Sequence, residues 1–410
     1  MRRLLRNLFE RVGRGQSEAI AVRFADGSSW QNRAGDPAVT VVFRTAAAEA
    51  RTLLLGYVGF FEAYFDQHID ILGEDAVGRL MRLAYGSAYR YQANPIVTLL
   101  RRWREWRDDN HDAAAAQANA RRHYGLPHPF FRLMLGEDCL YAEGIWDEGA
   151  TTLEEAQRHR CETICRALQL KPGERLVEVG SGWGEMALHA AERHGVEVVN
   201  YGLVPEQNAV MAERIRRRGL EGRVTIVEKD HRALLEEKER YEKYLSVGVY
   251  EHAGRRWQPA WIESIAAALK PGGMGLISTT SYPSQFATEY LTLKYVFPGG
   301  SVPSLPRLLE LLDRNGLHVV RVEELGWHYQ RTAACWLANV EAHWDEIAAL
   351  DPRRFDEKFR RVWTWYLHGV IEGFRPAGGG LDLHHILFTK GKGQWSRDGV
   401  RERAASGDGG

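Results

Sequence analysis

A glycine-rich loop that follows a short apolar run constrains the fold of this chain more than any other feature. Residues 176–184 read Leu-Val-Glu-Val-Gly-Ser-Gly-Trp-Gly, and a helical pattern at 186–194 follows them. Glycines let the backbone pass close to a ligand, because no Cβ stands in the way. A dinucleotide site would have the spacing Gly-x-Gly-x-x-Gly. This loop instead has Gly-x-Gly-x-Gly, with Glu178 two residues before the first glycine. An acid at this place suits an ammonium group, so the loop predicts a site for S-adenosylmethionine.

The loop stands at the first strand-to-helix turn of a regular alternation. Strand-like runs alternate with helical patterns at 186–194, 206–218 and 257–269; the runs are 176–179, 196–201, 224–228, 244–249 and 274–278. Such alternation is typical of a parallel, doubly wound sheet, which binds ligands at the carboxyl ends of its strands. Two further strand-like runs, 317–325 and 384–389, bracket a helical, tryptophan-rich insertion at 333–374. We therefore expect a Rossmann-like α/β fold with a helical insertion.

Residues 1–90 predict a separate small α+β domain. Two β-like runs, 19–24 and 39–43, precede helical patterns that begin at Thr45. Residues 1–18 read as a short basic amphipathic helix, which would either lie on an anionic bilayer or pack on its own domain. We expect residues 91–122 to form a linker with an amphipathic helix, and residues 393–410 to form a disordered tail.

The linker contains a basic, aromatic stretch between Arg101 and Arg107, in which Trp103 and Trp106 alternate with arginines. Tryptophan beside arginine suits a membrane interface, where the ring lies at headgroup level and the cation meets phosphate. A solvated linker helix would have the same pattern. Both interpretations stay open at the level of the sequence.

The composition excludes several classes of function. The formal net charge is zero, so no global field attracts the chain to nucleic acid. The four cysteines are too few for a disulfide scaffold and indicate reduced cytosolic thiols. Cys161 and Cys165 have no histidine pair at ligand spacing beside them, so we predict no metal site. No run of 18 apolar residues and no signal peptide are recognisable, which predicts a cytoplasmic protein.

From about residue 120 to 392 the chain resembles the cyclopropane-fatty-acyl-phospholipid synthases, a family that includes the mycolic acid cyclopropane synthases. The stretches that carry the resemblance are 123–126, 130–135, 170–173, 246–252, 269–273 and 295–300. The Lys-Pro-Gly and glycine-loop pieces occur in many methyltransferases, whereas Val-Tyr-Glu-His and Phe-Pro-Gly-Gly are more specific to this family. The N-terminal domain resembles the small sterol-carrier-like, lipid-interacting domain that some bacterial members carry.

The resemblance implies a class I S-adenosylmethionine-dependent methyltransferase fold over residues 123–392. It also implies that the cofactor's methyl carbon is added to the double bond of an unsaturated phospholipid acyl chain through a carbocation. The implied cofactor-binding residues, together with Glu178, are Tyr141, Gly180, Ser181, Gly182, Gly184, Leu203, Gln207, Asp230 and His231. One departure is that the end of the second strand has Asn200 and no carboxylate for the ribose; Gln207 could take that role.

A second departure concerns the catalytic base. The family binds a bicarbonate ion as base, and the resemblance places Glu251 and Tyr329 among its ligands. The positions of the family's cysteine and histidine ligands are here Glu143 and Ser278. We predict that Glu143 supplies the carboxylate in place of bicarbonate, and that Glu251 nearby raises the pKa of one of the two acids. The alternative is a purely structural hydrogen bond from Glu143.

A moved base favours loss of the proton after a hydride shift, which gives a 10-methylene-type branch. A separate reductase would then produce a methyl branch. A cyclopropane synthase, a heteroatom methyltransferase and a lipid-binding protein without catalysis remain as alternatives. We expect an unsaturated membrane phospholipid as partner, no nucleic acid, association with the inner face of the membrane, and a homodimer as one option for assembly.

Overall fold

The computed structural model describes residues 2–86, 94–147, 149–284, 286–376 and 378–391. The chain separates into two compact units, each made of non-contiguous segments. The first unit contains residues 1–107, 289–296 and 333–379, and the second contains 108–288, 297–332 and 380–410. The predicted tail at 393–410 lies outside the described residues. Among the described residues, no helix is both long and apolar enough to span a bilayer.

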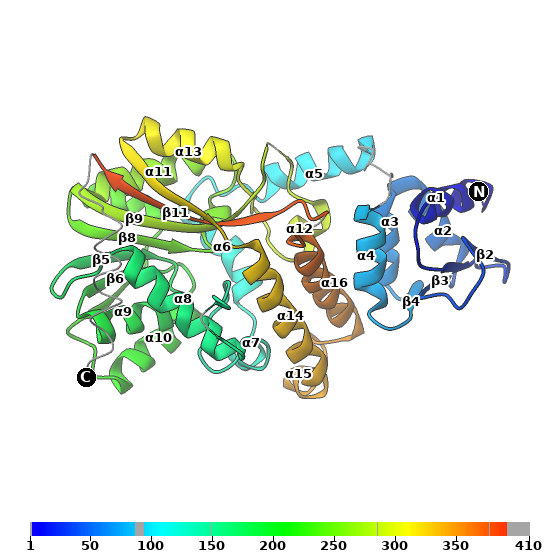
Figure 1. Cartoon of the computed structure of the whole chain (residues 1–410), viewed down its shortest axis with the longest axis horizontal. Helices are drawn as coiled ribbons and strands as arrows, with labels where there is room; N and C mark the ends of the chain where they lie inside the picture. Colours follow the sequence, from blue (N-terminus) through cyan, green and yellow to red (C-terminus); the bar gives the residue numbers. More distant parts are fainter. Residues whose placement is uncertain (1, 87–93, 148, 285, 377, 392–410) are drawn as a thin grey trace. The chain divides into compact units, whose positions relative to one another are not determined.

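The first unit contains a four-stranded sheet with the order β2-β1-β3-β4 (Figure 1). The strands are β1 (Ile20–Arg23), β2 (Ser29–Gln31), β3 (Val39–Phe43) and β4 (Ile69–Leu72). β1 and β3 are parallel, and the other two pairs are antiparallel. The sequence indicated β1 and β3, whereas β2 has only three residues and is too short to give a pattern.

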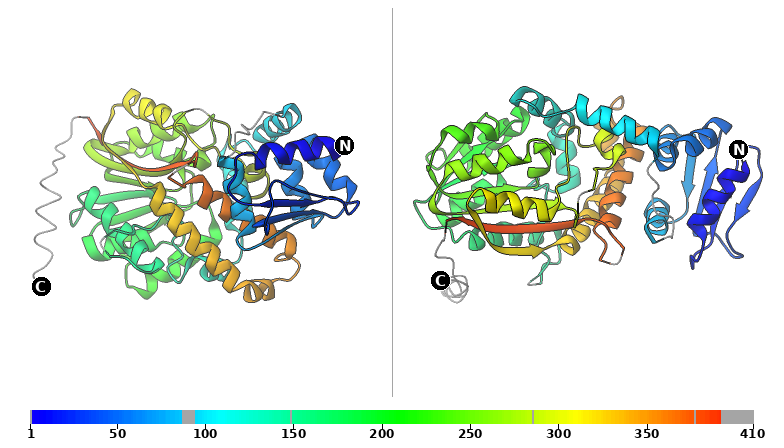
Figure 2. Two further views of the ribbon diagram at one scale, coloured as in Figure 1. Left: turned by 45° about the vertical axis from the view of Figure 1, so that its right-hand side comes forward. Right: turned by 90° about the horizontal axis from the view of Figure 1, so that it is seen from above.

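Helices make up the rest of the first unit. They are α1 (Arg2–Gly13), α2 (Ala46–Leu55), α3 (Tyr57–Phe65), α4 (Ala76–Gly86), α5 (Pro95–Arg107), α12 (Tyr290–Tyr295), α15 (Trp344–Leu350) and α16 (Glu357–Gly373). α1 lies beside the four-stranded sheet (Figure 2). Its Leu5 and Phe9 are buried, and the Phe9 ring lies 6.1 Å from that of Phe43. Of the two interpretations of the N-terminal helix, the structure therefore shows the one in which it packs on its own unit.

The second unit is built on a seven-stranded sheet with the order β10-β11-β9-β8-β5-β6-β7. The strands are β5 (Arg175–Val179), β6 (Glu197–Tyr201), β7 (Val224–Val227), β8 (Tyr241–Val247), β9 (Leu269–Ser281), β10 (Leu317–Glu324) and β11 (Asp382–Lys390). β5 to β9 are parallel, and β11 runs antiparallel to both of its neighbours. The predicted doubly wound α/β sheet is confirmed.

Helices cover both faces of this sheet (Figure 1). They are α6 (Ala113–Tyr124), α7 (His128–Leu135), α8 (Leu153–Ala167), α9 (Glu185–His194), α10 (Pro205–Arg217), η1 (His231–Glu236), η2 (Tyr250–Ala253), α11 (Gln258–Ala268) and α13 (Leu305–Arg314). α14 (Gly326–Ala342) begins in the second unit and ends in the first. α8 starts at a capping box, in which the Thr152 hydroxyl accepts from the Glu155 backbone and Glu155 reaches back.

The register of β9 with β11 brings distant residues together. β11 is buried along almost its whole length, as expected for a strand between two others. It pairs with β9 so that His385 stands directly opposite Ser278. Directly opposed residues have side chains on the same face of a sheet, about 5 Å apart. Ser278, which stands where the family has a histidine, is therefore a neighbour of His385 in the last strand.

Candidate active site

The glycine loop between β5 and α9 has the backbone that its sequence predicts. Gly180, Gly182 and Gly184 have φ angles of 81°, 58° and 95°, a region that other residues rarely adopt. A Cβ on Gly180 would lie 2.7 Å from Val249 Cγ2, and one on Gly184 would lie 2.5 Å from Met211 Cγ. A Cβ on Gly182 would meet no atom within 4 Å. Gly182 therefore borders open space, whereas Gly180 and Gly184 also permit close packing.

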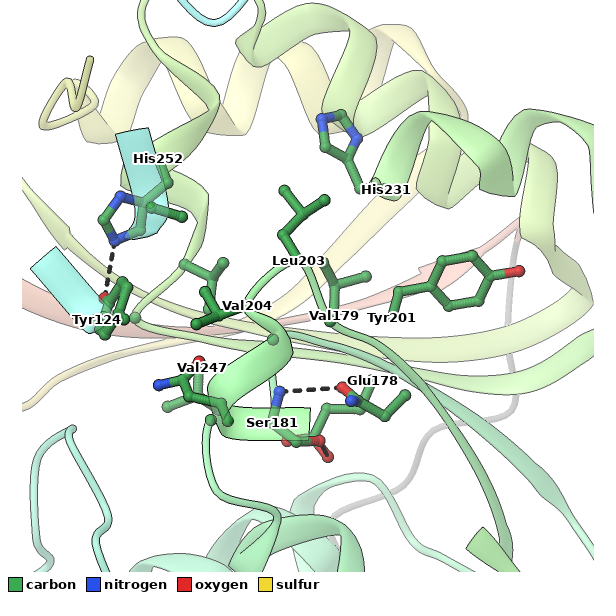
Figure 3. A pocket seen from close by; sticks show the side chains of 18 of the residues that line it. Tyr124, Glu178, Val179, Ser181, Tyr201, Leu203, Val204, His231, Val247 and His252 are labelled. Atoms are coloured by element: carbon green, nitrogen blue, oxygen red, sulfur yellow. Dashed lines mark hydrogen bonds between the residues drawn. The ribbon is translucent and has the colours of Figure 1, made fainter. Parts of the chain in front are cut away.

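A cavity lies at the carboxyl ends of β5 and β6, next to this loop (Figure 3). Nine of the ten predicted cofactor-binding residues line it: Tyr141, Glu178, Gly180, Ser181, Gly182, Leu203, Gln207, Asp230 and His231. The tenth, Gly184, is not among the lining residues and packs against Met211. The carboxyl edge of a parallel sheet is where α/β folds bind their ligands.

Two buried charged groups face this cavity. Glu178 is 2% exposed, and burial raises its pKa to about 7. The Ser181 hydroxyl donates to Glu178, and the Ser181 backbone N–H donates to Asn200 Oδ1 at 3.1 Å. Arg160, from α8, is also 2% exposed and lines the cavity.

Arg160 forms no salt bridge within 4 Å among the described residues, although its charge lowers the pKa of Glu143 and opposes the rise in the pKa of Glu178. Its Nη2 lies 3.9 Å from Cys161 Sγ, and its Nε has no hydrogen bond within the part of the chain that the structure describes. A buried charge without a partner is costly, which indicates that a ligand completes the site. The amino-acid end of S-adenosylmethionine carries one ammonium and one carboxylate, and Glu178 and Arg160 match these two charges.

Asp230 and His231 follow β7 and occupy another wall of the cavity. Burial opposes ionisation of Asp230, but hydrogen bonds from Arg232 at 2.6 and 3.0 Å hold its pKa below the ordinary value. Burial lowers the pKa of His231 to about 4, so its imidazole is neutral at pH 7. Its ring lies 4.0 Å from that of Trp261. This wall therefore combines the ionised Asp230–Arg232 pair with a neutral, aromatic surface from His231 and Trp261.

Two further lining residues were not assigned from the sequence. Tyr124 Oη and His252 Nε2 lie 2.9 Å apart and both face the cavity (Figure 3). Burial lowers the pKa of His252 to about 4. Both residues stand in the stretches that carry the family resemblance, so those stretches were the signal that could have identified them.

Glu143 is held by the two residues that β9 and β11 place opposite each other. It is 1% exposed, and its Oε1 accepts a hydrogen bond from Ser278 Oγ at 2.9 Å and one from His385 Nε2 at 2.6 Å. Burial alone would raise the pKa of Glu143, but the hydrogen bond and charge of His385 outweigh it and hold the pKa below the ordinary value. Both of these bonds go to Oε1.

Glu251, in η2, is a second carboxylate near β9, and it is half-buried. The Thr280 backbone N–H donates to its Oε1 at 2.6 Å, while Oε2 is buried and has no hydrogen bond in the described ranges. Burial raises the pKa of Glu251 to about 7. The sequence predicts that repulsion between Glu143 and Glu251 raises the pKa of one of these two acids. The structure corrects this, because the rise belongs to Glu251 and its cause is burial.

The start of α14 fixes the segment that carries Glu143. Thr332 Oγ1 accepts from the Gly144 backbone at 2.9 Å and from Trp146 Nε1 at 3.0 Å. His328 Nδ1 accepts from the Trp146 backbone at 3.0 Å. Tyr329 lies on this same turn and is half-buried. Neither Tyr329, Glu143 nor Glu251 is among the residues that line the cofactor cavity.

One cluster outside the site has the residue types of a metal centre. Potential ligand atoms of Cys165, His189 and His194 lie within 4.8 Å of one another. Sequence spacing did not indicate this grouping, because α8 and α9 bring the residues together through the fold. Glu162 lies within hydrogen-bond distance of both histidines, at 3.3 and 3.1 Å. The histidines are therefore already partnered, and the prediction of no metal stays untested.

A family model and several sequence relatives of this chain point to the same protein family. The family model described as mycolic acid cyclopropane synthetase matches residues 111–386. A probable fatty acid methyltransferase of Pseudomonas putida is 32% identical over 288 residues, covering 68% of this chain and 71% of that protein. A tuberculostearic acid methyltransferase of Mycobacterium tuberculosis is 28% identical over 391 residues, covering 90% of this chain and 87% of its own.

Solved structures agree with the sequence matches. The mycolic acid cyclopropane synthase CmaA1, complexed with SAH and CTAB, superposes with a TM-score of 0.61 at 26% identity. The superposition covers 69% of this chain and 99% of that one. It supports the fold.

Proposed function

Because the chain belongs to the mycolic acid cyclopropane synthetase family, we propose that it adds the methyl carbon of S-adenosylmethionine to the double bond of an unsaturated fatty acyl chain in a phospholipid. The chain is an S-adenosylmethionine-dependent methyltransferase of the α/β class. The acyl substrate, the phospholipid, the base and the product are the parts that we propose.

The contact between Glu143, Ser278 and His385 carries this proposal. The two positions at which the sequence departs from its family, 143 and 278, are joined by a hydrogen bond of 2.9 Å. His385 completes the group from β11. A carboxylate from the chain thus has hydrogen-bond donors at the place where the family resemblance implies a bound bicarbonate. Compensating changes at two contacting positions favour an exchange of base over loss of function.

The cofactor cavity would hold S-adenosylmethionine through Glu178 at the ammonium and Arg160 at the carboxylate. Gly182 leaves room for the ligand beside the loop. When bound, the cofactor supplies an electrophilic methyl carbon next to a sulfonium. Tyr124, Tyr141 and the neutral His231 and His252 line the cavity without adding a negative charge near pH 7.

Glu143 would act after the new carbon–carbon bond has formed. The alkene π electrons make that bond, which leaves a cation on the acyl chain that water would trap in an open site. Glu143 Oε2 would take one proton from the alkylated chain, and His385 and Ser278 would stabilise the orientation of the carboxylate through Oε1. Its lowered pKa keeps Glu143 ionised at neutral pH, which a base requires.

Glu251 would have a different role, because its pKa is about 7. At neutral pH about half of such carboxyl groups carry a proton, so Glu251 can take up or release one. We propose it as the group that exchanges the proton between turnovers. Tyr329 would support the site from the turn of α14 that also binds the 143–146 segment.

For the product we propose a methylene branch, formed when a hydride shifts along the chain before the methyl-derived carbon loses a proton. The relative that matches over 90% of this chain is named for tuberculostearic acid and not for a cyclopropane. A methyl branch would then need a separate reductase. A cyclopropane, formed when the proton leaves directly, is the alternative product.

The test is to incubate the full chain with methyl-labelled S-adenosylmethionine and vesicles of an oleoyl phospholipid. We expect label in the acyl chains after saponification, in a fatty acid that takes up two hydrogen atoms on mild catalytic hydrogenation. A labelled chain that resists mild hydrogenation would replace the branch by a ring. Label confined to the headgroup or to water-soluble products would overturn the acyl-chain proposal in favour of heteroatom methylation.

A further inference from the structure

α5 carries an apolar face that its own unit leaves uncovered. The residues Ile96, Leu99, Trp103 and Trp106 are 42%, 69%, 48% and 75% exposed. Their spacings of three, four and three residues place them on one side of the helix. We refer to these four residues as the exposed stripe. Single exposed apolar side chains are common, but a contiguous row of two tryptophans and two aliphatic residues marks an interaction surface.

The exposed stripe is separate from the face that α5 uses for packing. Val97 and Arg104, seven residues apart, are 5% and 9% exposed, and α5 packs on α12 within the same unit (Figure 1). The helix therefore has one covered face and one uncovered apolar face. Leu54 at the end of α2 is 60% exposed, and its carbonyl accepts a hydrogen bond from Asn94, the residue before α5. It extends the apolar surface at the start of the helix.

Arginines flank the exposed stripe on both sides. Arg102 and Arg107 are exposed, and the Arg107 guanidinium lies 4.9 Å from the centre of the Trp103 ring. Glu105 projects from the opposite side of the helix and pairs with Arg101. Tryptophan rings favour the level of lipid headgroups, and arginines beside them meet phosphate. An apolar row with Arg102 and Arg107 on its two sides matches an anionic bilayer better than it matches a typical protein surface.

We propose that the exposed stripe of α5 is the surface through which this protein docks on an anionic phospholipid bilayer. The inference rests on the proposed function, because it explains how an enzyme without a spanning helix in its described residues reaches acyl chains in a membrane. α1 does not compete for this role. Its Leu5 and Phe9 pack into the first unit, which leaves Leu4 as its large exposed apolar side chain.

The experiment measures binding of the full chain to vesicles of phosphatidylcholine with one third phosphatidylglycerol, by co-sedimentation. The variant L99E/W106E places charge at the two most exposed positions of the stripe, where the fold tolerates it. L4E is the matched control on α1. We expect L99E/W106E to lower vesicle binding at least about tenfold and L4E to leave it unchanged. R102E should weaken binding about fivefold at low salt and less at high salt.

Three readouts separate this inference from the proposed function. Thermal unfolding and S-adenosylmethionine affinity of L99E/W106E should match the unchanged protein. Its activity should fall on vesicles and persist on substrate dispersed in detergent micelles. Vesicle binding that survives L99E/W106E, or that L4E abolishes, overturns the docking surface. Vesicle binding through α5 without acyl-chain labelling would keep the docking surface and remove the proposed function. Binding that needs a protein partner, and is absent with lipid alone, also overturns the inference.

Discussion

Buried carboxylates of the two units differ in what neutralises them. Glu62 in the first unit is 5% exposed and is held by Arg51 at 2.5 Å and by Lys294. These cations outweigh its burial and hold its pKa below the ordinary value. Glu251 in the second unit is half-buried, forms no salt bridge among the described residues, and has a pKa that burial raises to about 7. The first arrangement stabilises the fold through ion pairs, whereas the second leaves a carboxyl group that can gain or lose a proton near pH 7.

Glu143 lies between these two cases. Its partner is an imidazole, which lowers its pKa, and the hydrogen bonds from His385 and Ser278 both go to Oε1. A carboxylate that is both ionised and accessible to a substrate proton is what a base needs. The contrast predicts that replacing Glu62 changes stability, whereas replacing Glu143 changes turnover.

The largest effect is expected for Glu143→Gln. The amide keeps the size of the side chain but cannot accept the proton, so we expect kcat to fall about a thousandfold. Calorimetry should show that S-adenosylmethionine affinity is retained, because Glu143 does not line the cofactor cavity. Activity close to that of the unchanged protein would leave Glu143 with a structural role only.

Glu62→Gln tests the first unit, where the carboxylate is paired with cations, and it should change stability. Removal of the anion leaves the two cations Arg51 and Lys294 facing each other. We therefore expect the free energy of unfolding, measured with urea, to fall by about 3 kcal/mol. The kcat of the folded fraction should stay unchanged. A large loss of kcat without a loss of stability would show that the first unit takes part in the chemistry.

The pH dependence of stability should reveal Glu251. Its folded pKa of about 7 lies above its ordinary value of 4.5, so the folded state retains the proton at pH values where the unfolded state has lost it. The stabilisation is therefore complete below pH 4.5 and is lost as the pH rises through 7. The difference of about 2.5 between the folded and the ordinary pKa of Glu251 corresponds to about 3 kcal/mol of folding free energy.

Glu251→Gln should remove the loss of stability that Glu251 causes between pH 5 and pH 8, as measured by urea unfolding at these two pH values. Glu178, whose pKa is also about 7, would still contribute its own decline in that variant. Identical slopes for Glu251→Gln and the unchanged protein would show that Glu251 is ionised in the folded state at neutral pH.

A smaller effect is expected for His385→Phe, which removes the donor that lowers the pKa of Glu143. The acidic limb of the pH–rate profile should move to higher pH, and a pKa that rises by about one lowers the rate on that limb about tenfold. His385→Gln, which can still donate, should restore part of the profile. His384→Phe is the matched control, because His384 contacts Ser281 instead. An unshifted profile in His385→Phe would separate His385 from the base.

Removal of bicarbonate from the buffer should have the smallest effect. If Glu143 supplies the anion, the rate stays unchanged in carbonate-free solution. The variant E143C/S278H restores the two residue types that the family resemblance implies, and its rate should then depend on added bicarbonate. A bicarbonate requirement in the unchanged protein would contradict the exchange of base.

The sequence could predict which residues meet at the cavity because most of them stand at or near strand ends. Glu178 lies near the end of β5, Ser181 and Asp230 stand shortly after β5 and β7, and the parallel strands have their carboxyl ends at the same edge of the sheet. The group of residues around Glu143 could be predicted only in part. His385 stands 242 residues later in the chain, and only the register of an antiparallel strand places it there.

A histidine pair inside an otherwise apolar run was the available signal for His385. His384 and His385 lie in β11, and the next residues of that strand, Ile386, Leu387 and Phe388, are all buried. Polar side chains in a strand buried on both faces need partners. Arg160 was missed for a similar reason, because a helix of mixed character does not reveal that one arginine turns inward without an anion.

The hydrogen bonds around Glu143 also decide how the protein depends on its surroundings. A base that is a diffusible ion has a dissociation constant, so its occupancy follows the supply of dissolved carbon dioxide and the activity of carbonic anhydrases in the cell. A tethered carboxylate is present in every molecule at a fixed effective concentration. An enzyme built in this way would work at the same rate in a carbonate-poor compartment as in a carbonate-rich one.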